Sequence, residues 1–326
     1  MNSAFLMLKG KQSPAFQLVD YGLDVWLGNA RGNDFSMKHR NLSNQDARFW
    51  DFSFHEMAVY DVPAAIDYIK DKTSQKSKIS YVGHSMGSTI SYIYSSIHPE
   101  HAKNNVDMLI SIAPVVFLRY IKTWIALGSP LYNFLERETN NIGLHGTGQY
   151  PQIKRYLKNF CFRVPYMSFC QRFLHSIVGT SVEQIEPQVM PLFYRRYPAS
   201  FSVKTLLHYM QEVTAGGRFQ WYNYGEKENL LRYKSTQPPE YDLEKIKLPV
   251  YLIYGDKDLV STENDVFKLF VKLKTQKCLK AYRADKGRVH FNHNDFLYSK
   301  HISEFNEFLA NIIRNSTSLS DMDECK

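Results

Sequence analysis

Short apolar segments that are predicted to form strands alternate along this chain with segments of helical periodicity. The predicted strands are residues 24–27, 79–83, 106–112, 250–254 and 278–283. The predicted helices are residues 53–71, 88–97, 262–273 and 296–313, the first of them beginning at a possible capping residue, Ser53. Short apolar strands that are separated by helices form a mostly parallel sheet with helices on both faces. The chain is therefore predicted to be an α/β protein.

The alternation stops between residues 115 and 245. This segment is rich in Phe, Tyr and Arg and is predicted to be mostly helical. Because it lies between two predicted strands, we expect it to form a cap over the C-terminal edge of the sheet. The sequence thus predicts two core parts, residues 1–114 and 246–314, with a cap at 115–245. A polar tail follows at 315–326.

The motif Gly83-His84-Ser85-Met86-Gly87 follows one predicted strand and precedes a predicted helix. The pattern G-x-S-x-G is weak alone, but this setting is that of a nucleophile elbow, in which a strained turn exposes the serine. The glycines leave room for the neighbouring strand and helix. Ser85 is therefore the candidate nucleophile, the alternative being a tight turn with an incidental serine.

A nucleophilic serine needs a base, and the base needs a carboxylate that orients it. Asp258 follows the predicted strand at 250–254, and His293 lies in the last loop before the final helix. The order Ser, Asp, His is that of α/β hydrolases. Among eleven histidines, His290 is the competitor for the base, and Asp256 is a second carboxylate.

Two other histidine roles are less favoured by the sequence. His84 is expected to pack beside the nucleophile rather than to act as the base. A metal site at His290 and His293 is an alternative, but no acidic or cysteine ligand set accompanies the pair, so neither a metal nor a cofactor is predicted.

The charge and hydropathy of the chain limit its partners. It has 326 residues, with 40 Lys and Arg against 32 Asp and Glu, and hence a net charge of +8. The basic residues are dispersed, so a nucleic-acid partner is not expected, whereas transient contact with an anionic lipid or membrane surface is compatible with this charge. No apolar run approaches the roughly 20 residues of a membrane-spanning helix, and the first residues are not those of a signal peptide.

Several stretches around these residues resemble the acid lipases, the family of the gastric and lysosomal lipases and many insect relatives. They are DVWLGNARGN at 24–33, FWDFSFHEM at 49–57, YDVPA at 60–64, the motif at 83–87, and residues 237–241, 255–259 and 292–296. The resemblance runs from about residue 4 to residue 313. It implies an α/β-hydrolase fold with a helical cap, in which Ser85 is the nucleophile, Asp258 the orienting acid and His293 the general base. Asp256 stands where the family usually has glycine.

The resemblance carries further expectations. Cys161 and Cys170 match a cap disulfide of the gastric members, and Asn41 and Asn315 begin glycosylation sequons, as in secreted or lysosomal proteins. The backbone N–H of Met86, where glutamine is usual, is expected to bind the oxyanion.

The family has further strands and a His-Gly-Leu-Leu segment, which supplies a second oxyanion N–H, before the 24–27 strand. The resemblance implies that this chain begins after them, as an N-terminally truncated member that lacks the first strands. His145-Gly146 is similar to that segment, but it follows the nucleophile and is not expected to replace it.

The predicted activity is that of a lipase, a serine ester hydrolase that cleaves triacylglycerols or sterol esters and acts as a monomer. The alternative from another class is a catalytically impaired lipid-binding protein that keeps the lipase shape, because one oxyanion segment is absent. An acyltransferase or a small-ester esterase on the same fold is the second enzymatic alternative.

Overall fold

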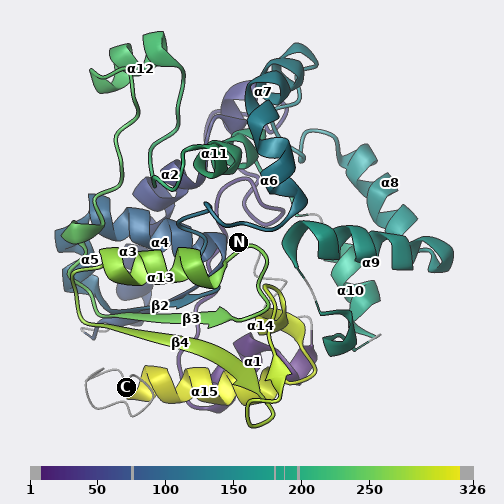
Figure 1. Cartoon of the computed structure of the whole chain (residues 1–326), viewed down its shortest axis with the longest axis vertical. Helices are drawn as coiled ribbons and strands as arrows, with labels where there is room; N and C mark the ends of the chain where they lie inside the picture. Colours follow the sequence, from purple (N-terminus) through teal and green to yellow (C-terminus); the bar gives the residue numbers. More distant parts are fainter. Residues whose placement is uncertain (1–8, 75–76, 180, 187, 197–198, 316–326) are drawn as a thin grey trace.

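A computed structural model describes residues 9–74, 77–179, 181–186, 188–196 and 199–315. Within them, one sheet holds five strands in the order β1 to β5 (Figure 1). The strands are β1 Ile79–His84, β2 Val106–Ile112, β3 Val250–Gly255, β4 Lys277–Ala284 and β5 Val289–His290. The first four are parallel, and β5 runs antiparallel to β4. The prediction of a mostly parallel sheet is confirmed.

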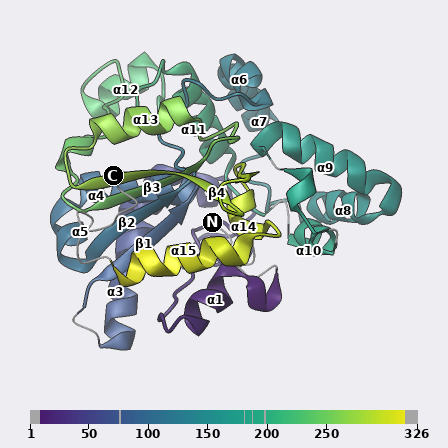
Figure 2. The same cartoon turned by 60° about the horizontal axis from the view of Figure 1, so that its bottom comes forward.

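Helices cover both faces of this sheet because successive strand residues point to opposite sides. Leu109 and Leu252 face a buried cluster with α4 Met86–Ile97 and α13 Glu263–Lys272. Ile110 and Tyr251 face a second cluster, which includes residues of α1 Pro14–Asp20 and α15 Ile302–Arg314. Figure 2 shows α13 on one side of the sheet and α1 and α15 on the other. A shorter helix, α5 Pro99–Asn105, connects α4 to β2.

The predicted helix at 53–71 is observed as one helical run over α2 Phe54–Glu56, a π-helical turn Met57–Asp61 and α3 Val62–Thr73. Ser53 caps it as predicted. Its hydroxyl accepts the N–H of His55 at 3.2 Å, and its own N–H donates to the Glu56 carboxylate at 2.7 Å. This reciprocal pairing satisfies backbone donors that the first turn of a helix leaves free.

Two predicted elements differ from those observed. Residues 24–27 do not form a strand: Trp26 turns outward, 42% exposed, and its ring contacts Tyr68 of α3, while Val25 packs toward the α15 side of the core. Residues 24–27 therefore pack against α3 and toward α15 instead of pairing with a strand. The final helix is interrupted, so that α14 Asp295–Tyr298 precedes α15; the chain turns at Ser299, whose hydroxyl donates to Gln184 at 3.1 Å.

The segment between β2 and β3 is mostly helical, as predicted. Its helices are α6 Trp124–Gly128, α7 Tyr132–Asn141, α8 Pro151–Phe162, α9 Val164–Val178, α10 Val189–Arg196, α11 Val203–Thr214 and α12 Glu226–Tyr233. In Figure 1, α8, α9 and α10 lie on the side toward which the arrowhead of β3 points. A disulfide joins Cys161 of α8 to Cys170 of α9, with the two Cα atoms 5.7 Å apart. No helix in the described part of the chain is long and apolar enough to cross a membrane.

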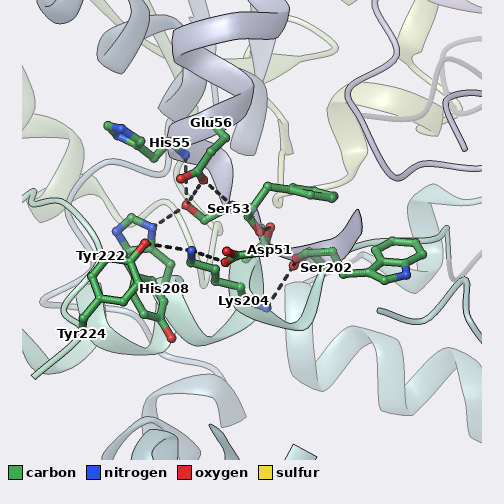
Figure 3. Close-up of polar contacts among 12 residues, drawn as sticks. Asp51, Ser53, His55, Glu56, Ser202, Lys204, His208, Tyr222 and Tyr224 are labelled. Atoms are coloured by element: carbon green, nitrogen blue, oxygen red, sulfur yellow. Dashed lines mark hydrogen bonds and ion pairs between the residues drawn. The ribbon is translucent and has the colours of Figure 1, made fainter. Parts of the chain in front are cut away.

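Polar contacts attach α11 to the loop that leads into α2 (Figure 3). His208 Nδ1 lies 3.0 Å from the hydroxyl of Ser53, and Lys204 Nζ donates to Asp51 at 2.6 Å. Ser202 donates to the backbone carbonyl of Trp50 at 2.6 Å. Burial lowers the pKa of His208 to about 3, so that this histidine is neutral in the contact. The inserted helices are thereby fixed to the same loop and helix that cover the sheet.

Candidate active site

The turn between β1 and α4 has the backbone geometry that the sequence motif predicts. Ser85 lies at φ 54° and ψ −118°, a strained conformation for a residue with a side chain. Its N–H donates to the carbonyl of Ile112 in β2 at 3.0 Å. A Cβ atom on Gly83 would lie 2.6 Å from the backbone carbon of Gly87. The strand and the helix can therefore approach each other this closely only if residue 83 is glycine.

The structure brings Ser85, His293 and Asp258 together. His293 Nε2 lies 2.8 Å from the Ser85 hydroxyl oxygen, and His293 Nδ1 lies 2.8 Å from Asp258 Oδ2. The side chains of His293 and Asp258 are almost wholly buried. Each residue follows a strand or the β5 hairpin, so the sheet topology gathers three distant parts of the chain at one edge.

Asp258 is held by its own loop. Its second oxygen, Oδ1, accepts the N–H groups of Val260 and Ser261, both at 2.8 Å. The carboxylate therefore has backbone donors on one oxygen and the imidazole on the other. This arrangement lets His293 present a proton-accepting nitrogen to a serine hydroxyl, which is the requirement for nucleophilic attack by serine.

The two competing residues form a pair of their own. His290 Nδ1 lies 2.6 Å from Asp256 Oδ2, and Arg283 donates to the same oxygen at 2.9 Å. His290 remains substantially exposed at the β5 hairpin. The contacts of Asp256 thus go to His290 and Arg283, whereas those of Asp258 go to His293.

This chain matches the α/β-hydrolase fold model over residues 11–297. It is 36% identical over 260 residues to a putative lysosomal acid lipase/cholesteryl ester hydrolase of Crotalus adamanteus, a match that covers 78% of this chain and 63% of the relative. It is 33% identical to lipase member K of Homo sapiens, covering 87% and 69%, and 34% identical to gastric triacylglycerol lipase of Rattus norvegicus, covering 91% and 74%. The chain belongs to the acid lipase family of α/β hydrolases.

In this acid lipase family member, Met86 begins α4. A helix leaves the N–H groups of its first turn without partners inside the helix. The Met86 N–H is therefore available beside the serine. By contrast, the N–H groups of His145 and Gly146 both donate to the side chain of Gln149, at 2.7 and 2.9 Å. Their donors serve a local turn, in agreement with the prediction that this dipeptide does not act at the site.

The turn that carries His293 includes two further polar residues, Asn292 and Asp295, for which the sequence predicted no role. The N–H of His293 donates to Asn292 Oδ1 at 2.8 Å, and the N–H of Asn292 donates to Asp295 Oδ2 at 2.7 Å. Asp295 Oδ1 also accepts the N–H of Ser181 from the inserted segment. The spacing Asn-His-x-Asp is the signal from which this turn could have been inferred.

A cavity of about 330 Å³ lies in another part of the fold, next to the contacts of Figure 3. It is lined by residues 47, 48, 50 and 51, by residues of α7 and α11, and by Tyr222 and Tyr224, among others. None of the three residues of the Ser-His-Asp arrangement lines it. Among the described residues, no group of three or more His, Cys, Asp and Glu side chains could hold a metal ion.

Proposed function

We propose that this acid lipase family member is a serine ester hydrolase that cleaves lipid esters, namely triacylglycerols, sterol esters or both. The observation that carries the proposal is the pair of 2.8 Å contacts from His293 to Ser85 and Asp258. In the proposed mechanism, His293 takes the proton of Ser85 as the serine oxygen attacks the ester carbonyl. Asp258 holds the imidazole and stabilises its positive charge.

The N–H of Met86 donates to the oxyanion of the tetrahedral intermediate, and His293 then gives its proton to the departing alcohol. A water molecule, deprotonated by His293, releases the fatty acid from the acyl-enzyme. The chain itself supplies the acid, the base, the nucleophile and one oxyanion donor.

Two observations support the proposed class of substrate: the names of the relatives and the apolar side chains exposed on the inserted helices. The relatives are named for triacylglycerol and cholesteryl ester hydrolysis. Large apolar side chains are exposed on α6, α7 and α9, among them Trp124, Leu127, Phe134 and Phe169. Exposed apolar side chains of this size favour contact with a lipid surface. We propose that residues 115–245 form a cap that covers the ester site and meets the lipid.

A secreted or lysosomal location agrees with the names of the relatives and with the Cys161–Cys170 disulfide. Asn41 and Asn315 are both exposed and are the proposed glycosylation positions. We propose that the enzyme acts as a monomer that touches a lipid surface transiently.

The test is turnover of p-nitrophenyl butyrate, triolein and cholesteryl oleate by the whole chain and by Ser85→Ala, together with labelling by a fluorophosphonate. We expect Ser85→Ala to abolish hydrolysis and labelling, because the probe reacts only with an activated serine. Asp258→Asn should lower kcat by about 10³–10⁴ because the imidazole loses its orienting charge.

Asp256→Asn is the matched control, two residues away in the same loop, and its kcat should stay within a few-fold of the unaltered chain. Equal losses in the two aspartate variants would contradict the role of Asp258. A chain that binds triolein without hydrolysing it, and that the probe does not label, would instead be a lipid-binding protein.

A further inference from the structure

His84, the last residue of β1, contacts the proposed base from the nucleophile's own strand. Its Nε2 lies 2.8 Å from the backbone carbonyl oxygen of His293, and the centroids of the two rings are 5.1 Å apart. Because a carbonyl oxygen only accepts hydrogen bonds, His84 Nε2 must carry the proton and donate it. The side chain is buried, with 7% of the residue exposed.

The charge state of His84 suits this contact. Burial lowers the pKa of His84 to about 3, and the neighbouring His293 lowers it as well. His84 is therefore a neutral donor at pH values well above 3. A neutral neighbour also matters because His293 becomes positively charged in the proposed mechanism, and a second imidazolium 5 Å away would oppose that charge.

The backbone and the ring of His293 are fixed at separate points. Its N–H donates to Asn292, its Nδ1 pairs with Asp258, and its carbonyl accepts from His84. His84 is also the chain neighbour of Ser85. Its hydrogen bond thus joins the backbone that carries the nucleophile to the backbone that carries the base, on a path separate from the Ser85–His293 contact itself.

We propose that His84 is a positioning residue, which sets the distance between Ser85 Oγ and His293 Nε2 through its hydrogen bond to the carbonyl of His293. The proposal rests on the proposed function, and His84 acts through His293 rather than on the ester. Without the donor, the loop at 291–294 can move away from the elbow. A displacement of about 1 Å between reacting groups lowers rates by about 10²-fold.

The test compares His84→Gln with His84→Met. The two side chains have the same length and similar shape, but only glutamine can donate to the carbonyl. We expect His84→Met to lower kcat for p-nitrophenyl butyrate, and the rate of fluorophosphonate labelling, by about 10- to 100-fold with little change in KM. His84→Gln should recover most of both rates at the same thermal unfolding midpoint. If the methionine variant does not fold, His84→Asn replaces it, since its amide is too short to reach the carbonyl.

A second measurement does not depend on turnover. Proton NMR should detect the His293 Nδ1–H, hydrogen-bonded to Asp258, as a far-downfield signal in the whole chain and in His84→Gln. The signal should broaden or move upfield in the variant that lacks the donor. Equal rates and unchanged signals in the methionine and glutamine variants would overturn the role of His84.

Equal losses in both variants would overturn it as well, because they would mean that the imidazole is needed for packing and not for donation. If the unaltered chain shows no Ser85-dependent hydrolysis, the proposed function fails, and the NMR signal alone then decides the positioning role.

Discussion

Asp256 and Asp258 are the same residue type in one loop, yet their surroundings give them different tasks. Asp256, whose side chain is 17% exposed, is contacted by the partly exposed His290 and by Arg283. Asp258 has no exposed side-chain surface and is hydrogen-bonded on both oxygens, which prevents it from turning away from His293. Burial and fixed partners, rather than residue type, make a carboxylate able to orient a base.

At the residue scale, Asp295 should make the stability of the fold depend on pH. Burial raises the pKa of Asp295 from 3.8 to about 6, partly opposed by hydrogen bonds from Ser181 and Asn292. The folded state then binds the proton more tightly than the unfolded chain between about pH 4 and pH 6. The contribution of this group to stability is therefore most favourable below pH 4 and is lost as the pH rises through 6, by at most about 3 kcal/mol.

Asp295→Asn should accordingly flatten the dependence of the thermal unfolding midpoint on pH between 4 and 7, even if it lowers the midpoint itself. We expect only partial flattening, because burial also raises the pKa of Glu212, which still makes the midpoint depend on pH in the variant. Asp71→Asn, an exposed surface change, should leave the slope as it is. An unaltered slope in Asp295→Asn would show that Asp295 titrates alike in the folded and unfolded states.

At the scale of elements, the tight contact between β1 and α4 should make Gly83 intolerant of any side chain. Gly83→Ala would place a methyl group within 2.6–2.7 Å of backbone atoms of Gly87 and Ser88, which cannot move without shifting the helix. We expect a loss of at least about 2–3 kcal/mol in the free energy of unfolding, measured by urea denaturation.

Gly28→Ala is the control for this change. A Cβ atom at Gly28 would meet nothing within 4 Å, and its backbone is not in the left-handed region. Its free energy of unfolding should stay within about 0.5 kcal/mol of the unaltered chain. Similar losses at both glycines would mean that the close approach at Gly83 is not what requires glycine there.

Elements that are buried on both sides could be predicted from sequence alone. β3 is a continuous apolar run, β2 is mostly apolar and buried, and the elbow has a motif of fixed spacing, so the order of the elements and the position of the proposed site could be predicted from the sequence. Residues 24–27 have a strand-like composition as well, but whether a segment becomes a strand depends on a partner edge, and Trp26 packs on α3 instead. The hydrogen bond from His84 to the carbonyl of His293 and the contact of Asp295 with Ser181 could not be predicted, because they join residues that only the finished fold brings together.

At the scale of the whole molecule, the exposed apolar side chains of the inserted helices should matter for lipid droplets and not for dissolved esters. Trp124 and Leu127 are 64% and 71% exposed on α6. The double change Trp124→Ser and Leu127→Ser should lower hydrolysis of emulsified triolein by about tenfold or more, because burial of each side chain in lipid contributes roughly 1.5–3 kcal/mol. Hydrolysis of dissolved p-nitrophenyl butyrate should be unchanged.

Val19→Ser is the control for the droplet assay, since Val19 is 53% exposed on α1, a helix of the sheet's other side (Figure 2). Val19→Ser should change the rate of hydrolysis of neither triolein nor p-nitrophenyl butyrate. A parallel loss on both substrates in the α6 variant would indicate damage to the fold or the site instead of weaker contact with lipid.

The insertion of helices between β2 and β3 also affects how the protein is made. β2 pairs with β3 through Leu109–Val250 and the residues that follow, so one edge of β2 has no partner until residues 113–249 have been synthesised. At 5–20 residues per second this takes on the order of ten seconds. During that time the nascent chain would carry strands whose mostly apolar side chains and unpaired backbone N–H and C=O groups are exposed, a kind of surface that is prone to aggregate and that chaperones protect. Expression yield should therefore depend on the speed of translation through the insertion.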